Sequence, residues 1–394
     1  MDPRTNPYSP GAGNPPPELV GRDELIEKIS IELDRCKNGL SHRSFLMVGL
    51  RGVGKTVLLN RLATDAEVNH FAVVSIETPE RRSLPALLAP PLRSTLIKLD
   101  TSAAANDIVK KTLKVLGSFI GAMKIKYNDI EFGIDLGKEA GLADSGDLEN
   151  DLTELFLQIG LAAKERQTAF VLFIDEIQYI KEEEFAALIM ALHKCTQRQL
   201  PVMVVGAGLP QLIGQAGEAK SYAERLFQYP EIGPLDRDAA KKALTLPAAE
   251  KGVNYTDEAL EEILSQTKGY PYFLQEWGKH SWQCADSSPI TGDDARQASR
   301  IAISELDGSF FRVRFDRLTQ SEKKYLRAMA ELGDGPHRSG DIAHLLEKEV
   351  QSGAPIRASL INKGMIYSPD HGDNSFTVPL FDGYMKRVIP KLEN

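Results

Sequence analysis

The sequence predicts an α/β fold: a doubly wound parallel sheet, then a helical segment, then a C-terminal winged helix. Three observations support this fold class. Short apolar runs alternate with helical stretches from residue 18 to about 235, which is typical of parallel strands covered by helices on both faces. Residues 236–305 have the pattern of helices only. From residue 316, three helices precede two apolar segments around a turn, which is the winged-helix pattern.

Four apolar runs predict the strands of the sheet. Each is short and almost continuously apolar, as expected of buried parallel strands. They lie at Phe45–Val48, 71–78, 169–175 and 201–207, with helices expected between them, including 149–165 and 182–197, and a fifth strand expected at 230–235.

The chain of 394 residues is long enough for two or three domains. Residues 1–17 are rich in Pro, Gly, Asn and Ser, and we expect them to be disordered. The expected domains are then a sheet domain at 18–235, a helical lid at 236–308 and a winged-helix domain at 309–394. A hairpin with a turn at Asn128-Asp129 is expected within about 123–135, and packing on the core is its simplest role.

Composition excludes several classes of protein. A formal charge of -8 argues against coating nucleic acid over the whole surface. Residues 309–394, with 13 Lys/Arg against 11 Asp/Glu, leave room only for a local or weak DNA contact. No apolar run reaches the roughly 18 residues of a membrane span, and no signal-peptide pattern opens the chain. The three separated cysteines suggest neither disulfides nor a zinc site, so we expect a cytoplasmic protein without a membrane partner.

A glycine-rich loop follows the first predicted strand. Gly49 to Thr56, GLRGVGKT, matches GxxxxGK[ST] with a strand before it and a helix after it. In this motif, backbone N–H groups and the helix N-terminus hold phosphates, the lysine reaches the β and γ oxygens, and the hydroxyl binds magnesium. The alternative is a glycine turn that matches by chance. The predicted phosphate-binding residues are Gly49, Gly52, Val53, Gly54, Lys55, Thr56 and Val57.

Two acids end the third predicted strand. In FVLFIDE, Asp175 stands at the carboxyl end of the strand, where it is placed to hold magnesium, and Glu176 is placed to accept a proton from an attacking water. The alternative is a helix cap after a strand. The pair of acids favours ATP hydrolysis over binding alone, with ATP and Mg2+ as cofactors.

These motifs resemble the P-loop ATPases between the AAA+ and STAND groups, which include origin-recognition-type initiators, archaeal-type ATPases and transposition regulators. The resemblance rests on the two motifs, on LVGRDEL before the first strand, and on a lid and winged helix after the sheet. It implies that Val20, Gly21 and Arg22 lie over the adenine. Without the resemblance, this segment would only be a helix start.

The chain departs from the AAA+ pattern in two places. The fourth strand ends Gly206-Ala207-Gly208, where a polar residue usually orients the water, so this role is vacant or passes to Gln178 or Gln211. Gly269-Tyr270-Pro271 replaces an expected arginine and is closer to the GxP element of STAND ATPases, in which the proline contacts the nucleotide. A helix start without a ligand is the alternative for Pro271.

An arginine precedes the fifth expected strand. Arg225 occupies the position at which related ATPases present an arginine finger to a neighbouring subunit, and such a cation would stabilise charge on the γ-phosphate. The alternative is an ion pair on a helix surface, for example with Glu224.

The expected recognition helix of the winged domain, 354–363, offers few groups for DNA. Arg357, Asn362 and Lys363 are the candidate DNA contacts, and the wing at about 366–376 carries acids but no Lys or Arg. A winged helix that packs on the ATPase or on a protein partner is the alternative.

Three functions remain open from the sequence. The first is an ATP-hydrolysing switch whose nucleotide state controls self-association or a protein partner. The second is a DNA-associated initiator or transposition regulator that grips duplex DNA through the winged helix. The third is an adaptor that holds a nucleotide with little turnover.

Overall fold

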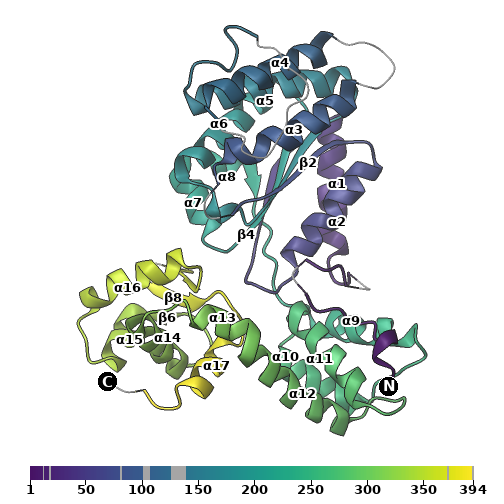
Figure 1. Ribbon diagram of the computed structural model, residues 1–394, viewed down its shortest axis with the longest axis vertical. Helices are drawn as coiled ribbons and strands as arrows, with labels where there is room; N and C mark the ends of the chain where they lie inside the picture. The colour runs from purple at the N-terminus through teal and green to yellow at the C-terminus, as the bar shows by residue number, and fades with distance from the viewer. Residues whose placement is uncertain are drawn as a thin grey trace. The chain divides into compact units, whose positions relative to one another are not determined.

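The computed structural model describes residues 1–11, 13–16, 19–79, 82–100, 107–125, 139–370 and 372–392. The chain divides into two compact units. The first contains Met1–Gly21, Gly49–Val57 and Ile232–Asn394, and the second contains Arg22–Val48 and Leu58–Glu231. Figure 1 shows the course of the chain through both units.

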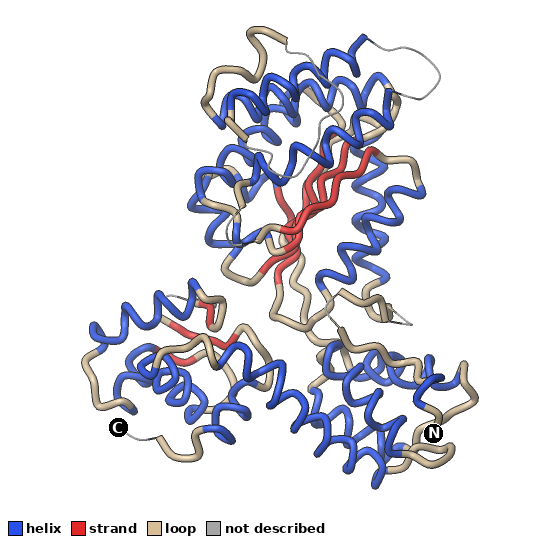
Figure 2. The backbone as a smooth tube through the Cα atoms, viewed as in Figure 1, coloured by secondary structure: helices blue, strands red, loops and turns tan. Residues whose placement is uncertain are grey.

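The second unit is built on a five-stranded parallel sheet, drawn in red in Figure 2. The strands are β1 (Ser44–Val48), β2 (Ala72–Glu77), β3 (Phe170–Asp175), β4 (Val202–Gly208) and β5 (Phe227–Gln228), in the order β2-β3-β4-β1-β5. The four longer strands lie where the apolar runs predict them. Val48 pairs with Gly208 and Ile174 with Gly206, so β1, β3 and β4 end at the same edge of the sheet.

The fifth strand lies earlier than expected. β5 covers Phe227–Gln228, and within 230–235 only Glu231 forms a bridge, to Val48. Pro230 and Pro234 explain the difference, because proline has no N–H to donate to a strand ladder.

Helices cover both faces of the sheet, as the α/β prediction requires. Leu46, Val74, Leu172 and Val204 share one core with residues of the helices on their side. Figure 1 shows α1 and α2 on the opposite side of the sheet. The helices are α1 (Asp23–Lys37), α2 (Lys55–Val68), α3 (Leu84–Asp100), α4 (Asp107–Ala122), α5 (Leu148–Glu165), η2 (Ile177–Tyr179), α6 (Glu182–Gln197), α7 (Leu212–Ala219) and α8 (Ala223–Leu226).

The first unit contains the lid, which is helical as predicted. Thr291 caps its last long helix with a capping box to Asp294, which satisfies the first free N–H groups. The predicted boundary after residue 308 falls inside an unbroken helical run from Gly292 to Phe315. The elements are α9 (Arg237–Ala249), α10 (Asp257–Thr267), α11 (Pro271–Cys284), α12 (Gly292–Leu306), η3 (Asp307–Phe311) and α13 (Arg312–Phe315).

The C-terminal domain has the helices and small antiparallel sheet expected of a winged helix. Its sheet order is β6-β8-β7. Phe311 lies against Phe273 of the lid and against Phe381 and Tyr384 of the C-terminal domain, which joins the two parts in one aromatic core. The elements are α14 (Gln320–Leu332), β6 (His337–Arg338), α15 (Ser339–Leu345), α16 (Val350–Asn362), β7 (Ile366–Tyr367), β8 (Asp373–Phe376) and α17 (Phe381–Val388).

The expectation of a disordered N-terminal segment is wrong for its described residues. A short helix, η1 (Pro3–Thr5), precedes Tyr8, whose ring is buried against Gly278 of α11. The Tyr8 hydroxyl donates to the Leu244 carbonyl and accepts from the Tyr255 hydroxyl at 2.7 Å. Burial of one aromatic ring, with both hydrogen bonds of its hydroxyl formed, is enough to order the segment despite its polar composition.

Three other expectations concern the inserted hairpin, a membrane span and the cysteines. The hairpin expected at about 123–135 lies almost wholly outside the described residues. No helix in the described ranges is long and apolar enough to cross a membrane. The three cysteines are free thiols.

Candidate nucleotide site

The glycine-rich loop starts directly after β1, because Val48 is the last residue of that strand. At Gly49 a Cβ atom would lie 2.2 Å from the Ile232 carbonyl oxygen, so a side chain there is excluded. Gly54 has φ +89° with no heavy atom within 4 Å of a Cβ position. The backbone at Gly54 therefore turns in a conformation that favours glycine and faces open space, which fits a loop that wraps phosphate.

The loop lysine is buried beside the backbone of the loop. Its Nζ donates to the carbonyl oxygens of Gly49 at 2.8 Å and Leu50 at 2.9 Å. α2 begins at Lys55 and runs to Val68, so the N–H groups of its first turn, including those of Thr56 and Val57, point back toward the loop. Val53 is buried and fixes the middle of the loop by packing.

The two acids at the end of β3 are held by the neighbouring strand. The Glu176 N–H donates to Asp175 Oδ1 at 2.8 Å. The Thr78 hydroxyl, one residue beyond β2, donates to the carbonyl oxygens of Asp175 at 3.0 Å and Glu176 at 2.6 Å. Glu176 has φ 52°, a left-handed conformation that is unusual for a side chain of its size. Thr78 thus stabilises the turn that presents the two acids.

Gln178 is hydrogen-bonded both to Glu176, the candidate catalytic glutamate, and to the backbone just after β4. Its Nε2 donates to Glu176 Oε2, and its Oε1 accepts from the Leu209 N–H at 3.1 Å. A Cβ atom at Gly208 would lie 2.7 Å from Gln178 Oε1, and one at Gly206 would lie 2.7 Å from Leu46. Gly208 therefore leaves space for Gln178, whose polar side chain lies beside the end of β4.

Two of the residues expected over the adenine, Val20 and Gly21, pack against other residues of the first unit. At Gly21, φ is +72° and a Cβ atom would lie 2.9 Å from Cβ of Ala239 in α9. Val20 and Leu235 both pack against the core of the first unit. Arg22 is half-buried and stands just before α1.

The GxP element lies between this segment and the phosphate loop. The Gly269 carbonyl accepts the Leu235 N–H at 2.9 Å, and Pro271 is the half-buried first residue of α11. The Tyr272 N–H then donates to the Gly52 carbonyl of the loop at 3.1 Å. Within the first unit, contacts through Leu235 and Tyr272 thus connect Gly21, Pro271 and the phosphate loop.

The C-terminal domain also reaches the phosphate loop. The Arg51 N–H donates to the Thr377 carbonyl at 2.9 Å, one residue after β8. Thr377 is itself buried, and its N–H donates to the Met365 carbonyl at 3.0 Å. Backbone groups of two adjacent loop residues are therefore hydrogen-bonded to the lid and to the C-terminal domain.

Arg225 is exposed on the short helix α8, between β4 and β5. This exposure agrees with a group that acts on another subunit, and equally with a surface ion pair. Its role stays a prediction.

The candidate DNA contacts are mostly engaged inside the C-terminal domain. Arg357 donates from Nε to Asn374 Oδ1 and from Nη2 to Ser368 Oγ, both at 2.7 Å, which ties α16 to the wing. Lys363 Nζ lies 2.7 Å from Glu322 Oε2. Asn362 is exposed.

The lowered pKa of Glu322 indicates how strongly this carboxylate interacts with Lys363. Burial alone would raise the pKa of Glu322, but hydrogen bonds from Lys363, the Thr319 N–H and Ser359 hold the pKa at about 2. A lysine committed to such a carboxylate has little freedom to bind a phosphate of DNA.

The sequence does not single out Thr78, Tyr272 or Thr377. Thr78 carries a usable signal, because a hydroxyl residue directly after a strand lies at the edge where the acids end. Tyr272 and Thr377 contact the loop through backbone atoms. Because every residue has these atoms, the contacts cannot be predicted from residue types.

Two family models match the chain. Residues 18–205 match the AAA ATPase domain, and residues 308–385 match a domain of unknown function (DUF8462). No curated protein sequence is significantly similar to this chain.

Solved structures are similar to this chain to different degrees. A Walker-type ATPase of Pyrococcus abyssi is 18% identical, with a TM-score of 0.59 over 93% of this chain and 96% of that one. At this identity the likeness shows the fold alone. The RuvB Holliday junction branch migration motor of Thermotoga maritima is 16% identical over 90% and 92% of the two chains, with a TM-score of 0.43. Orc1 of Aeropyrum pernix, solved with DNA, is 15% identical over 94% of each chain, with a TM-score of 0.45.

The family match and the site agree. The matched residues contain the phosphate loop, the acids at the end of β3 and all of the sheet except β5 and the last residues of β4. The parallel order β2-β3-β4-β1-β5 is typical of P-loop proteins. Residues 18–205 are an AAA ATPase domain of the P-loop class, and the chain is an ATPase.

Proposed function

We propose that this ATPase is a nucleotide-controlled switch. ATP and ADP would change how the lid and the C-terminal domain hold the phosphate loop, and so control self-association or binding of a protein partner. One observation carries the proposal: Arg51 and Gly52, adjacent in the loop, are hydrogen-bonded through their backbone to Thr377 and Tyr272. If the loop rearranged around phosphates, the hydrogen bonds from Arg51 to Thr377 and from Tyr272 to Gly52 would both change.

The residues of the site suit magnesium and ATP. When ATP binds, the Lys55 ammonium would exchange its hydrogen bonds to the Gly49 and Leu50 carbonyls for bonds to the phosphate oxygens. The residues that would flank the base are Val20, Gly21, Arg22 and Pro271. Thr56 and Asp175 would hold Mg2+, which would neutralise phosphate charge when bound. The open space at Gly54 supports this fit.

Glu176 is the proposed general base, and Gln178 would hold its carboxylate toward the water. The hydrogen bond between them supports hydrolysis over mere retention of the nucleotide. The adaptor with little turnover is therefore the weaker proposal.

A DNA-gripping function has less support. Arg357 and Lys363 bind partners within the C-terminal domain, so α16 offers few cations to duplex DNA. A DNA contact would have to use other residues.

Hydrogen–deuterium exchange tests the switch. We would compare peptides covering residues 49–57, 269–277 and 363–380 with ATPγS, with ADP and without nucleotide, and measure the mass of the protein in solution in each state. We expect ATPγS and ADP to give different exchange in the two peptides outside the loop, with a change in assembly size or in partner binding.

Lys55→Ala is the control, because it removes the cation of the loop and should abolish every nucleotide-dependent difference. Exchange that changes in the loop peptide alone, with one mass in all states, would contradict the switch and leave a simple ATPase.

A further inference from the structure

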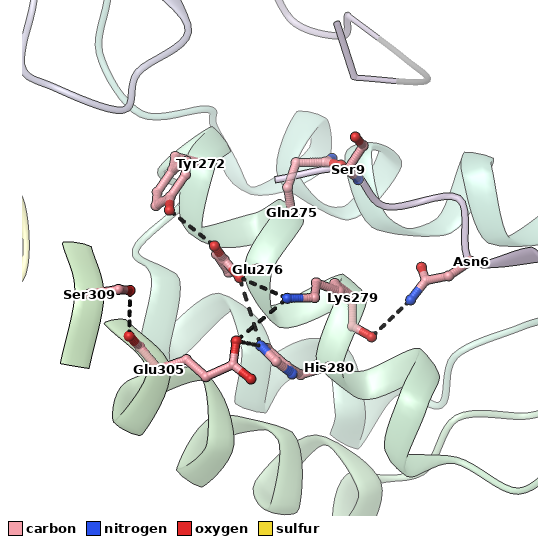
Figure 3. A network of polar contacts seen from close by, with 9 residues as sticks. All are labelled: Asn6, Ser9, Tyr272, Gln275, Glu276, Lys279, His280, Glu305 and Ser309. Carbon is pink, nitrogen blue, oxygen red and sulfur yellow. Dashed lines mark hydrogen bonds and ion pairs between the residues drawn. The ribbon is translucent and has the colours of Figure 1, made fainter. Parts of the chain in front are cut away.

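Three side chains converge between two helices of the lid, apart from the nucleotide site. Glu276 and His280 stand one turn apart on α11, and Glu305 projects from α12 (Figure 3). His280 Nε2 lies 3.3 Å from Glu305 Oε2 and 3.7 Å from Glu276 Oε2. One ligand atom from each residue falls within 4.8 Å of the others.

The imidazole is the unusual member of this group. The His280 side chain is only 2% exposed, and its Nε2 is buried without a hydrogen-bond partner of good geometry among the described residues. A buried polar atom without a partner is unfavourable, so an ion at this position would satisfy it. Burial lowers the pKa of His280, and Lys279 lowers it further, while Glu305 and Glu276 raise it.

We propose that Glu276, His280 and Glu305 bind one divalent transition-metal ion of the zinc class. One imidazole and two carboxylates form a nitrogen-and-oxygen ligand set that suits Zn2+ better than Mg2+, which prefers oxygen ligands only. Ligands about 2.0–2.1 Å from a tetrahedral ion lie roughly 3.4 Å apart, close to the two measured separations. The two carboxylates balance the charge of the ion, and water would complete the coordination.

Lys279 is the competitor for this site. Its Nζ lies 3.5 Å from Glu305 Oε2 and 3.9 Å from Glu276 Oε2, so its ammonium partly neutralises the same carboxylates. Both separations are long for a charge-assisted hydrogen bond, and the side chain is 31% exposed. A bound ion displaces the ammonium toward water at little cost, since the lysine stem is flexible.

The site is connected to the phosphate loop through Glu276. Its other oxygen, Oε1, accepts the Tyr272 hydroxyl at 3.0 Å, and this contact orients the carboxylate, as an outer-shell partner does in metal sites. The Tyr272 N–H is the group that donates to Gly52.

Zinc binding to the full chain tests the proposal. The protein would be stripped with a chelator, checked for metal by mass spectrometry and titrated with Zn2+ against a competing chromophoric chelator. We expect one ion per chain with Kd below about 10 µM. His280→Ala and Glu305→Gln should each weaken binding by at least about tenfold. Glu305 is largely exposed, so its amide variant should fold even if His280→Ala does not.

Two further variants separate a metal site from an ion-pair network. Lys279→Met should strengthen Zn2+ binding several-fold, because it removes the competing ammonium. Glu250→Gln, on the surface of the same unit, is the matched control and should leave binding unchanged. No saturable binding to the wild-type chain, or equal affinity in Glu305→Gln, would overturn the proposal and leave an ion-pair network held by Lys279.

Discussion

Gln178 occupies the space that Gly208 leaves at the end of β4. Its amide contacts both Glu176 and the Leu209 N–H, so it fixes the direction of the proposed base relative to the sheet. A residue of this kind acts by position, because its own chemistry contributes no proton transfer.

Gln178→Ala should therefore lower kcat for ATP hydrolysis by about 10- to 100-fold and change KM little. Steady-state phosphate release measures both. Gln211→Ala is the control, since the buried Gln211 Oε1 has no hydrogen-bond partner in the described part of the chain. A larger loss from Gln211→Ala than from Gln178→Ala would transfer the positioning role to Gln211.

Glu176→Gln keeps the shape of the proposed base and removes its proton affinity. We expect hydrolysis to fall by about 10²- to 10⁴-fold while ATP affinity stays near the wild-type value. Lys55→Ala should have the opposite profile and weaken binding first. Binding of a fluorescent ATP analogue, with phosphate release, distinguishes the two. Wild-type turnover in Glu176→Gln would show that another group takes the proton.

At the scale of elements, α16 is attached to its neighbours by its own cations. Lys363 forms an ion pair with Glu322, which is the third residue of α14 and closes its capping box with Thr319, so one ion pair stabilises two helices. Its effect must depend on pH, because the pKa of Glu322 falls from 4.5 to about 2 in the folded protein.

Lys363→Met should lower the free energy of unfolding of the C-terminal domain by about 1.5–3 kcal/mol at pH 7. A depressed carboxyl pKa stabilises the fold above the unfolded pKa, and this contribution is lost as the pH falls toward 2. The difference between variant and wild type should therefore shrink between pH 4.5 and 2. Denaturation at several pH values measures it, and a difference independent of pH would remove Glu322 from the explanation.

The N-terminal segment is a second element whose effect can be measured. Tyr8→Phe should lower the free energy of unfolding of the lid by about 1 kcal/mol, because the Leu244 carbonyl and the Tyr255 hydroxyl lose a partner. Tyr8→Ala should cost about 3–5 kcal/mol, since it also leaves a cavity against Gly278. Thermal denaturation, with Tyr367→Phe as the half-buried control, tests this. Equal midpoints for Tyr8→Ala and wild type would show that the segment does not hold the lid.

At the scale of the whole molecule, variants of Arg225 test whether the ATPase works alone or with a neighbouring subunit. If its exposed guanidinium acts on a neighbouring subunit, hydrolysis per chain should rise with protein concentration. Arg225→Ala should abolish that rise and leave nucleotide affinity nearly unchanged, because a finger stabilises the transition state more than the ground state.

Mixing two inactive variants makes this test sharper. Arg225→Ala keeps the proposed base and Glu176→Gln keeps the finger, so the mixture should recover part of the activity. Rates that do not depend on concentration, with a mixture as inactive as its components, would indicate a monomeric ATPase in which Arg225 is a surface residue.

The sequence by itself determined the α/β class, the four longer strands and the two nucleotide motifs. These features are local: apolar runs set the strands, and glycine spacing sets the loop. It also determined the helical lid and the winged-helix pattern, because helical periodicity and turn residues are read over short windows.

Only the tertiary structure decided what lies beside the phosphate loop and how the remaining polar groups are used. The contacts of Tyr272 and Thr377 with the loop are backbone contacts without a sequence signature. Arg357 and Lys363 are candidate DNA contacts from the sequence alone, and only the structure shows that long-range partners engage both within the domain. The burial of Tyr8 and the meeting of His280 with Glu305 depend in the same way on residues far apart in the chain, whose approach is set by the packing of whole helices.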